Sequence, residues 1–269
     1  AFKTYLDARE YVYGEKKKPM SLMDLGTINA RILRKKGELD DEDKSDEVNA
    51  CTVNVKVNVG GEDKDYLLYF KNETHNHPTE IEPFGGASTC IGGGIRDPLS
   101  GRSFPYQGLR ITGSKSPLTP YEETIPGKRP SRQICKVALE GFTDYANQIG
   151  INAGIAKEFY HPGFEAKRLE LGALVAATPK DYVRREAPVV GDVILLIGAD
   201  TGRDGLGAAV GSSKIQTDES LEKAGTDVQK GNPSAERKII RLFNNKKATK
   251  LIKKCNDFGA GGVSVAIGE

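Results

Sequence analysis

The sequence predicts an α/β protein, because segments with the period of a strand alternate with segments that have the period of a helix. Valine occupies every second position from residue 53 to residue 59, which is typical of a strand with one buried face. Apolar side chains recur at helical spacing over residues 131–149. Residues 171–177 form an apolar run that predicts a further strand. The 269 residues are enough for one large domain or two smaller ones.

The first predicted element is a helix near residues 22–36. It opens with a capping pattern at Ser21, carries basic residues in its last turn and stops at Gly37. Acidic residues dominate the stretch from 38 to 47 that follows, which we interpret as a connection between elements.

The next predicted element is a hairpin. The alternating strand at residues 51–59 turns at two consecutive glycines into a second strand over residues 66–70. Its valines need a buried face, so we expect the helices near residues 22–36 and 131–149 to cover one side of the hairpin.

A pause in the pattern between residues 184 and 191 marks the predicted domain boundary. An all-apolar strand over residues 193–197 begins just after it. We therefore assign residues 1–186 to an N-terminal domain and residues 187–269 to a C-terminal domain, which we expect to be truncated because the chain stops just after a glycine cluster.

Two further features are predicted in the C-terminal part. Residues 198–207 form a second glycine-rich turn. Asn232 caps a long helix that has Pro233 at its first position and continues towards Ile252.

The composition excludes several classes of protein. Lysine and arginine total 39 against 37 acidic residues, so charge gives no reason to expect nucleic acid or an anionic membrane as partner. No apolar run is long enough to span a bilayer, and no basic-then-apolar leader opens the chain. The four cysteines lie far apart and form no CxxC pair, which favours reduced thiols over a disulfide framework. We therefore expect a cytoplasmic protein.

The first candidate site follows the second hairpin strand, in the segment FKNETHNHP. If the strand continues, Lys71, Glu73, His75 and His77 lie on one face, an arrangement costly in a core and useful in an active site. Glu73 can bind a divalent metal, His75 can move a proton and Lys71 can meet a phosphate. The alternatives are a solvated edge strand and a His-x-His transition-metal site, for which His161 is the only other histidine.

A glycine-rich segment, GGASTCIGGGIRD, covers residues 85–97. Backbone without side chains lets amide groups approach phosphate oxygens closely. Asp97 can add a second carboxylate to a magnesium ion, and Arg96 can clamp a substrate phosphate or carboxylate. The segment is neither a Walker A loop nor a GxGxxG fingerprint, and the alternative is a glycine-packed turn between two elements.

Two isolated polar residues complete the candidates. Gln229 lies in VQKGNP before the capped helix, and Asp257 lies in NDFGAGG after it. Spacing does not show whether the two meet, and by itself it favours a surface amide and an aspartate in a helix-terminal turn.

Several long segments carry a resemblance to a known family. They are KNETHNHPTEIEPFGGAST, GGGIRDP, DYANQIGINAG, VGDVILLIGADTGRDGLG, VQKGNP and NDFGAGG, in this order. Over nearly its whole length the chain resembles the formylglycinamidine ribonucleotide synthases, which share a superfamily with aminoimidazole ribonucleotide synthetase and selenophosphate synthetase. The resemblance implies an N-terminal mixed-sheet domain with helices on one face, whose strands build a barrel with a partner copy, and a C-terminal α/β domain.

The resemblance also implies a reaction. ATP phosphorylates the amide oxygen of formylglycinamide ribonucleotide, and ammonia released from glutamine displaces the phosphate to give the amidine of de novo purine biosynthesis. Matched to the family's motifs, His75 is the proton acceptor. The magnesium ligands are Glu73, Asp97 and Asp257. The substrate contacts are Thr74, Asn76, His77, Arg96 and Gln229. The nucleotide contacts are Lys71 and the glycines Gly86, Gly92 and Gly93, in a phosphate-proximal loop from residue 86 to residue 97.

The chain departs from the family's pattern in three respects. Residues 1–50 contain no histidine, although the family carries one upstream in its active site. The second synthetase half is absent, and nothing supplies the cysteine–histidine–acid set of a glutaminase. The resemblance thus implies partners: a glutaminase domain or subunit that delivers ammonia, and a second synthetase half or a second copy, without which an apolar sheet face is exposed.

Two other functions remain open from the sequence. One is a superfamily relative with a different substrate, such as aminoimidazole ribonucleotide synthetase, against which the THNHP segment argues. The other is a non-catalytic nucleotide-binding or interaction module.

Overall fold

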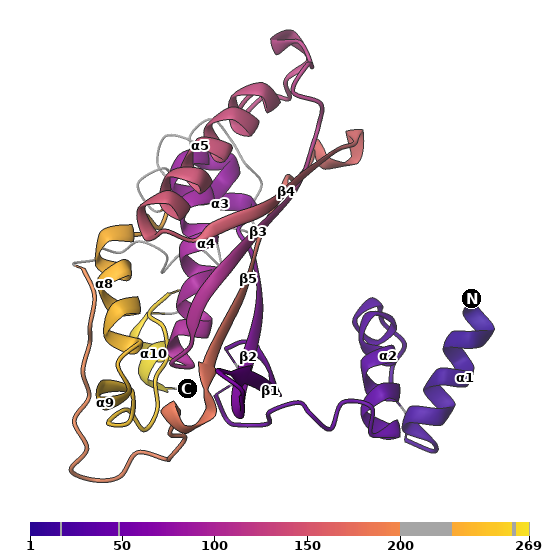
Figure 1. The fold of residues 1–269 in the computed structure, drawn as a ribbon. Helices are drawn as coiled ribbons and strands as arrows, with labels where there is room; N and C mark the ends of the chain where they lie inside the picture. Colours follow the sequence, from indigo (N-terminus) through magenta and orange to yellow (C-terminus); the bar gives the residue numbers. More distant parts are fainter. Residues whose placement is uncertain (17, 48, 200–227, 260–261, 269) are drawn as a thin grey trace.

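A five-stranded mixed sheet is the centre of the protein (Figure 1). The computed structural model describes residues 1–16, 18–47, 49–199, 228–259 and 262–268. In sheet order the strands are β1 (Cys51–Val59), β2 (Glu62–Thr74), β5 (Leu169–Pro179), β3 (Phe104–Ser114) and β4 (Asn152–Tyr160). Only β3 and β4 pair in parallel, and the other neighbours are antiparallel. The predicted hairpin and the mixed sheet are confirmed.

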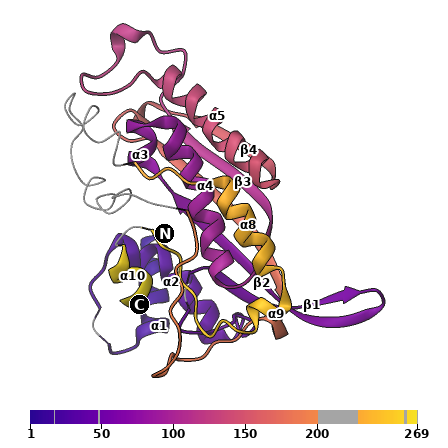
Figure 2. The ribbon, with the colours of Figure 1, turned by 90° about the vertical axis from the view of Figure 1, so that its left-hand side faces the viewer.

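A layer of helices covers one face of this sheet (Figures 1 and 2). The helix α4 (Pro83–Ser100) packs directly on β2, β5 and β3. The helix α5 (Ser131–Ile149) packs on α4, and α8 (Pro233–Phe243) packs on α5 and α4. The main core lies between these layers and includes Ile91, Phe142 and Leu174. A second helical layer thus holds α4 against the strands.

The opposite face of the sheet is apolar and exposed. Side chains on alternate positions of β5 point to opposite faces of the sheet, and those on the face away from α4 align across the sheet with five apolar residues of the other strands. These five residues are Phe70 of β2, Phe104 and Ile111 of β3, and Ile155 and Phe159 of β4. Ile155 and Phe159 are each 53% exposed. Within the described residues no α-helix packs on this face, and the Phe164 ring covers it only near Gly113, so most of the predicted apolar sheet face is open.

The helix predicted near residues 22–36 forms, but it does not cover the hairpin. The helix α2 (Leu22–Lys36) packs against α1 (Phe2–Tyr13), and the two form a helical hairpin to one side of the sheet (Figure 1). The buried carboxylate of Asp24 accepts hydrogen bonds from Tyr5, Tyr13 and Arg9. The inward side of α2 therefore packs on α1, and the expectation that it covers β1 and β2 was wrong. The helix α5 was also expected to cover this hairpin, but it packs on α4, which is the helix that contacts β2.

Two predictions for the C-terminal part also need correction. The long helix after Asn232 is split into α8 and α9 (Lys246–Thr249), because the side chain of Asn245 accepts a hydrogen bond from the Lys247 amide and starts a new helix. Residues 193–197 are exposed and form no strand, since nothing in the described part of the chain pairs with them. Most of the predicted turn at 198–207 lies outside the described residues.

The remaining elements are short. They are the helices α3 (Asn76–Ile81) and α10 (Val263–Gly268) and the 3₁₀ helices η1 (Tyr121–Glu123), η2 (Pro162–Phe164) and η3 (Lys180–Tyr182). Among the described residues, no helix has the length and apolar character needed to cross a membrane.

Candidate active site

The candidate site lies where the end of β2 meets α4. Because β2 continues to Thr74, Lys71 and Glu73 lie on one face of the strand, as predicted, and this face is the one that packs on α4. The Nζ atom of Lys71 lies 2.7 Å from Oδ2 of Asp97 and 3.6 Å from Oε2 of Glu73. The strand and the helix thus bring together one cation and two carboxylates that are more than twenty residues apart in the chain.

Negative charge accumulates at this point. Burial raises the pKa of Asp97 to about 7, and the neighbouring charge of Asp257 adds to this rise. Burial also raises the pKa of Glu73, and Asp257 again contributes. Three carboxylates therefore share one partly buried region, in which Lys71 supplies a nearby positive charge.

These carboxylates can contribute to a magnesium site only in part. Magnesium prefers oxygen ligands and commonly takes one or two carboxylates together with phosphate and water, which Glu73 and Asp97 can match. In the described part of the chain, no group of three or more histidine, cysteine, aspartate or glutamate side chains is arranged to hold a metal by itself. The fit therefore depends on oxygen atoms that a nucleotide or substrate brings.

Arg96 borders this cluster on α4. Its Nη1 atom lies 3.5 Å from Oε2 of Glu236 on α8, and its Nε atom lies 3.9 Å from Oδ2 of Asp257. Oε2 of Glu236 also accepts a hydrogen bond of 2.5 Å from the hydroxyl of Tyr145 on α5. Neither Glu236 nor Tyr145 was predicted. A signal for Glu236 exists in the sequence, since it shares the buried stripe of α8 with Ile240 and Phe243 at helical spacing.

The predicted phosphate loop is wrong. Residues 83–100 form the continuous helix α4, so most backbone amides of this segment donate within the helix and are not available to a phosphate. The glycines serve close packing instead. A methyl carbon at Gly86 would lie 2.5 Å from the Thr79 backbone, and one at Gly92 would lie 2.8 Å from the Tyr145 ring. Gly93 has more room and lies beside Arg96 and Glu73, facing the candidate site.

His75 is not on the strand face predicted for it. The strand ends at Thr74, and His75 precedes α3, with its backbone amide donating to the Glu170 carbonyl at 2.9 Å. Burial, with help from the positive charge of Arg96, lowers the pKa of His75 to about 4. Its Nε2 atom is buried and has no hydrogen-bond partner among the described residues. The imidazole is therefore neutral at pH 7 and lies close to Arg96.

His77 is also displaced from the predicted strand face. It lies inside α3, where its Nδ1 atom is 3.1 Å from Nζ of Lys167. Burial and the charge of Lys167 lower the pKa of His77. The segment bends out of the strand because Pro78 suits the first turn of a helix and cannot donate to a sheet. The third histidine, His161, lies by η2 and binds the amide of Gly163, so the structure does not unite the three histidines.

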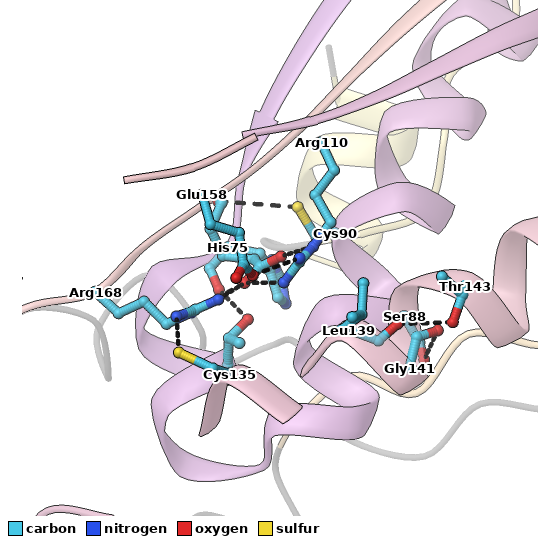
Figure 3. Close-up of polar contacts among 12 residues, drawn as sticks. His75, Ser88, Cys90, Arg110, Cys135, Leu139, Gly141, Thr143, Glu158 and Arg168 are labelled. Atoms are coloured by element: carbon cyan, nitrogen blue, oxygen red, sulfur yellow. Dashed lines mark hydrogen bonds and ion pairs between the residues drawn. The ribbon is translucent and has the colours of Figure 1, made fainter. Parts of the chain in front are cut away.

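A buried ionic network supports the segment that contains His75. Glu170 is fully buried and binds two arginines, Nε of Arg110 at 2.7 Å and Nη2 of Arg168 at 2.9 Å. Figure 3 shows Arg110 and Arg168 converging near His75. The backbone amide of Glu170 donates to Oδ1 of Asn76 at 2.7 Å. Asn76, predicted as a substrate contact, therefore already uses its carbonyl oxygen to hold this segment in place, whereas Thr74 is exposed at the end of β2.

The two residues from the distant segments also reach α4. The backbone carbonyl of Gln229 accepts a hydrogen bond of 2.5 Å from Thr89, which ties residues 228–232 to the helix. Gln229 and Asp257 are both half-buried, so Gln229 is not the surface amide that spacing alone favoured.

Comparison with known proteins gives relatives for most of the chain. The family model described as AIR synthase related protein, C-terminal domain, matches residues 189–269. The phosphoribosylformylglycinamidine synthase subunit PurL of Methanopyrus kandleri is 32% identical over 211 residues, which cover 77% of this chain and 28% of that protein. The PurL subunit of Leptospira biflexa is 33% identical over 204 residues, covering 75% of this chain and 26% of that protein. The chain thus spans little more than a quarter of these relatives.

Solved structures agree on the fold. Thermotoga maritima PurL complexed with FGAR superposes with a TM-score of 0.62 at 24% identity and covers 98% of this chain and 40% of that chain. The structure of PurLQS from the same organism gives a TM-score of 0.60 at 25% identity, covering 97% of this chain and 35% of that one.

Proposed function

Because the chain belongs to the phosphoribosylformylglycinamidine synthase family, we propose that it carries part of an ATP-dependent synthetase site that converts formylglycinamide ribonucleotide into its amidine. The observation that carries the proposal is the meeting of Lys71, Glu73, Arg96 and Asp97 beside the neutral, half-buried His75. This arrangement combines groups that suit a polyphosphate with a group that can take a proton.

The reaction needs an activated amide. The amide oxygen of formylglycinamide ribonucleotide attacks the γ-phosphorus of ATP, so an O–P bond forms and the bond to ADP breaks. Ammonia then attacks the carbon of the phosphorylated amide, the C–O bond breaks so that phosphate leaves, and a proton must be removed from the attacking nitrogen. Phosphate is a far better leaving group than oxide, which is the physical reason for using ATP.

Each charged residue has a proposed role in this sequence. Glu73 and Asp97 would hold magnesium, with Asp257 close by, and the ion would supply positive charge to the phosphates. Lys71 would contact the nucleotide phosphates once the carboxylates engage the ion. Arg96 would bind an anionic group of the substrate, because its planar guanidinium matches phosphate and carboxylate oxygens. The other proposed substrate contacts are Thr74, Asn76, His77 and Gln229.

His75 would accept the proton from the attacking ammonia. An imidazole with a pKa of about 4 is a weak base, but a phosphate group bound nearby would raise that pKa towards neutrality, since a close negative charge favours the protonated form. The unpartnered Nε2 atom supports the role, because a general base needs a lone pair that no other group uses.

The proposed partners follow from the open face of the sheet. We infer that the apolar residues of this face pack against a second synthetase half or a second copy of the chain, because exposed apolar patches of this kind mark interaction sites. Glutamine would serve as the amide donor through a glutaminase domain or subunit that delivers ammonia. We propose a cytoplasmic location, as expected for purine biosynthesis, and two domains that meet near residue 187.

The experiment is a turnover assay of the full-length protein with ATP, magnesium, formylglycinamide ribonucleotide and an ammonium salt. We expect ADP formation to depend on formylglycinamide ribonucleotide. His75→Ala should reduce kcat by about 10²–10⁴-fold, which is the usual contribution of a general base. His161→Ala is the matched control and should retain normal turnover, because His161 lies by η2 away from the cluster. ADP formation that ignores formylglycinamide ribonucleotide would contradict the proposal and favour a different substrate or a binding module.

A further inference from the structure

We propose that Glu236 of α8 is a positioning residue that orients the Arg96 guanidinium for an anionic group of the substrate, with Tyr145 holding the Glu236 carboxylate in place. The inference rests on the proposed function and extends it to residues outside the family motifs used above. It assigns α8 a part in substrate binding rather than in packing alone.

Three helices meet at this contact. Oε2 of Glu236 lies 2.5 Å from the Tyr145 hydroxyl, which donates to it, and 3.5 Å from Nη1 of Arg96. The Glu236 side chain is only 6% exposed, and Tyr145 belongs to the main core. Since a buried carboxylate is costly without partners, these two contacts offset part of that cost at Oε2, whereas Oε1 has no hydrogen-bond partner among the described residues.

The contact leaves Arg96 able to bind a ligand. A guanidinium has five N–H donors in a planar fork. Glu236 faces one terminal nitrogen, Nε has no hydrogen-bond partner among the described residues, and the nearest Asp257 oxygen is 3.9 Å away. Arg96 is therefore held on the side of Glu236 and Tyr145, while its Nε donor, which lies nearest to Asp257, stays unsatisfied and can be met by a phosphate or carboxylate of the substrate.

A purely structural role explains the residue less well. Glu236 occupies the same stripe of α8 as Ile240 and Phe243, all three of them buried. An apolar side chain at this position would pack α8 against its neighbours without the desolvation free energy that a buried charge costs, because replacing a buried ion pair by apolar groups is often neutral or stabilising. What an apolar residue does not supply is a fixed direction for the Arg96 side chain.

The kinetic test is a double-mutant cycle in the full-length protein, with Glu236→Gln, Arg96→Ala and the double variant. Glu236→Gln keeps the shape and a hydrogen-bond acceptor for Tyr145 but removes the charge. We expect it to lower kcat/KM for formylglycinamide ribonucleotide by roughly 10- to 100-fold, the cost of a small misplacement of a binding group, while the KM for ATP changes little. In the Arg96→Ala background the same change should have no further effect. Effects that multiply would overturn the proposal.

A second measurement does not depend on turnover. Modification of Arg96 by phenylglyoxal, followed by peptide mass spectrometry, reports how firmly the guanidinium is held. We expect faster modification in Glu236→Gln than in the wild type. Tyr145→Phe, which keeps the core aromatic ring and should fold normally, is expected to give an intermediate rate. An unchanged rate in Glu236→Gln would refute the positioning role. If the wild type fails to turn over formylglycinamide ribonucleotide, the proposed function falls, and the labelling rates still decide whether Glu236 restrains Arg96.

Discussion

Two neighbouring glycines of α4 should respond in opposite ways to the addition of one methyl group. A methyl carbon at Gly92 would lie 2.8 Å from Cζ and 2.9 Å from the hydroxyl oxygen of Tyr145. At Gly93 the nearest atom would be Nη2 of Arg96 at 3.4 Å, the end of a long side chain. Tyr145 cannot retreat easily, because its ring lies in the core and its hydroxyl is bound to Glu236.

The expected magnitudes follow from these contacts. Alanine in place of glycine inside a helix raises the free energy of unfolding by ~0.5–1 kcal/mol, and this gain applies equally to Gly92→Ala and Gly93→Ala. At Gly92 the overpacking against Tyr145 costs about 1–3 kcal/mol, as is usual for an extra carbon in a filled core. Gly92→Ala should therefore be less stable than Gly93→Ala by ~1–3 kcal/mol.

The assay is equilibrium unfolding in urea followed by circular dichroism, with extrapolation to water. Gly93→Ala is the matched control, since it has the same chemistry one residue along the same helix. Equal free energies of unfolding for the two variants would show that Tyr145 yields freely. The explanation of the glycine run as a packing device would then be wrong.

Three further outcomes are expected. The pKa of His75 is about 4 in the folded protein and about 6.5 in the unfolded chain, so the unfolded chain binds the proton more readily. Between pH 6.5 and pH 4 the free energy of unfolding of the wild type should therefore fall by ~3 kcal/mol, and that of His75→Asn should not show this fall. The pKa of Asp97 is raised to about 7, so its effect on stability has the opposite dependence on pH: without metal, the free energy of unfolding of the wild type should fall as the pH rises from 4 to 7, and that of Asp97→Asn should fall less. If Asp97→Asn leaves the magnesium dependence of nucleotide binding unchanged in calorimetry, Asp97 is not part of the metal site. Ile155→Lys on the open sheet face should weaken self-association of the chain in analytical ultracentrifugation, and identical sedimentation of the variant and an associating wild type would argue against that interface.

Local periodicity was sufficient to predict the hairpin of β1 and β2 and the helix α5, because each depends on residues that are close in sequence. The glycine run of α4 was misread for a physical reason. Glycine suits both a phosphate loop and a close helix contact, and the choice is made by distant partners. Gly141 of α5 illustrates this: a methyl carbon there would lie 2.1 Å from the Phe84 carbonyl oxygen, 57 positions earlier in the chain (141 − 84).

The candidate site divides in the same way. Lys71 and Glu73 could be paired from strand alternation alone, and β2 keeps them on one face. His75 could not be placed, because the end of the strand is set by the turn into α3. Glu236 could not be assigned to Arg96, since the contact joins helices that are 140 residues apart (236 − 96) and only the packing of α8 brings them together.

The position of β5 in the sheet determines the order in which the site can be assembled during synthesis. It is the last of the five strands in the chain, yet it lies in the middle of the sheet, between β2 and β3. The hairpin of β1 and β2 can form early from local contacts, whereas β2 and β3 have no common neighbour until residues 169–179 leave the ribosome. Until then β2, which carries Lys71 and Glu73, has an unpaired edge, and the backbone of Glu170 that fixes His75 is not yet available. The chemistry of the site is therefore encoded early in the chain but becomes functional geometry only after the late insertion of its central strand.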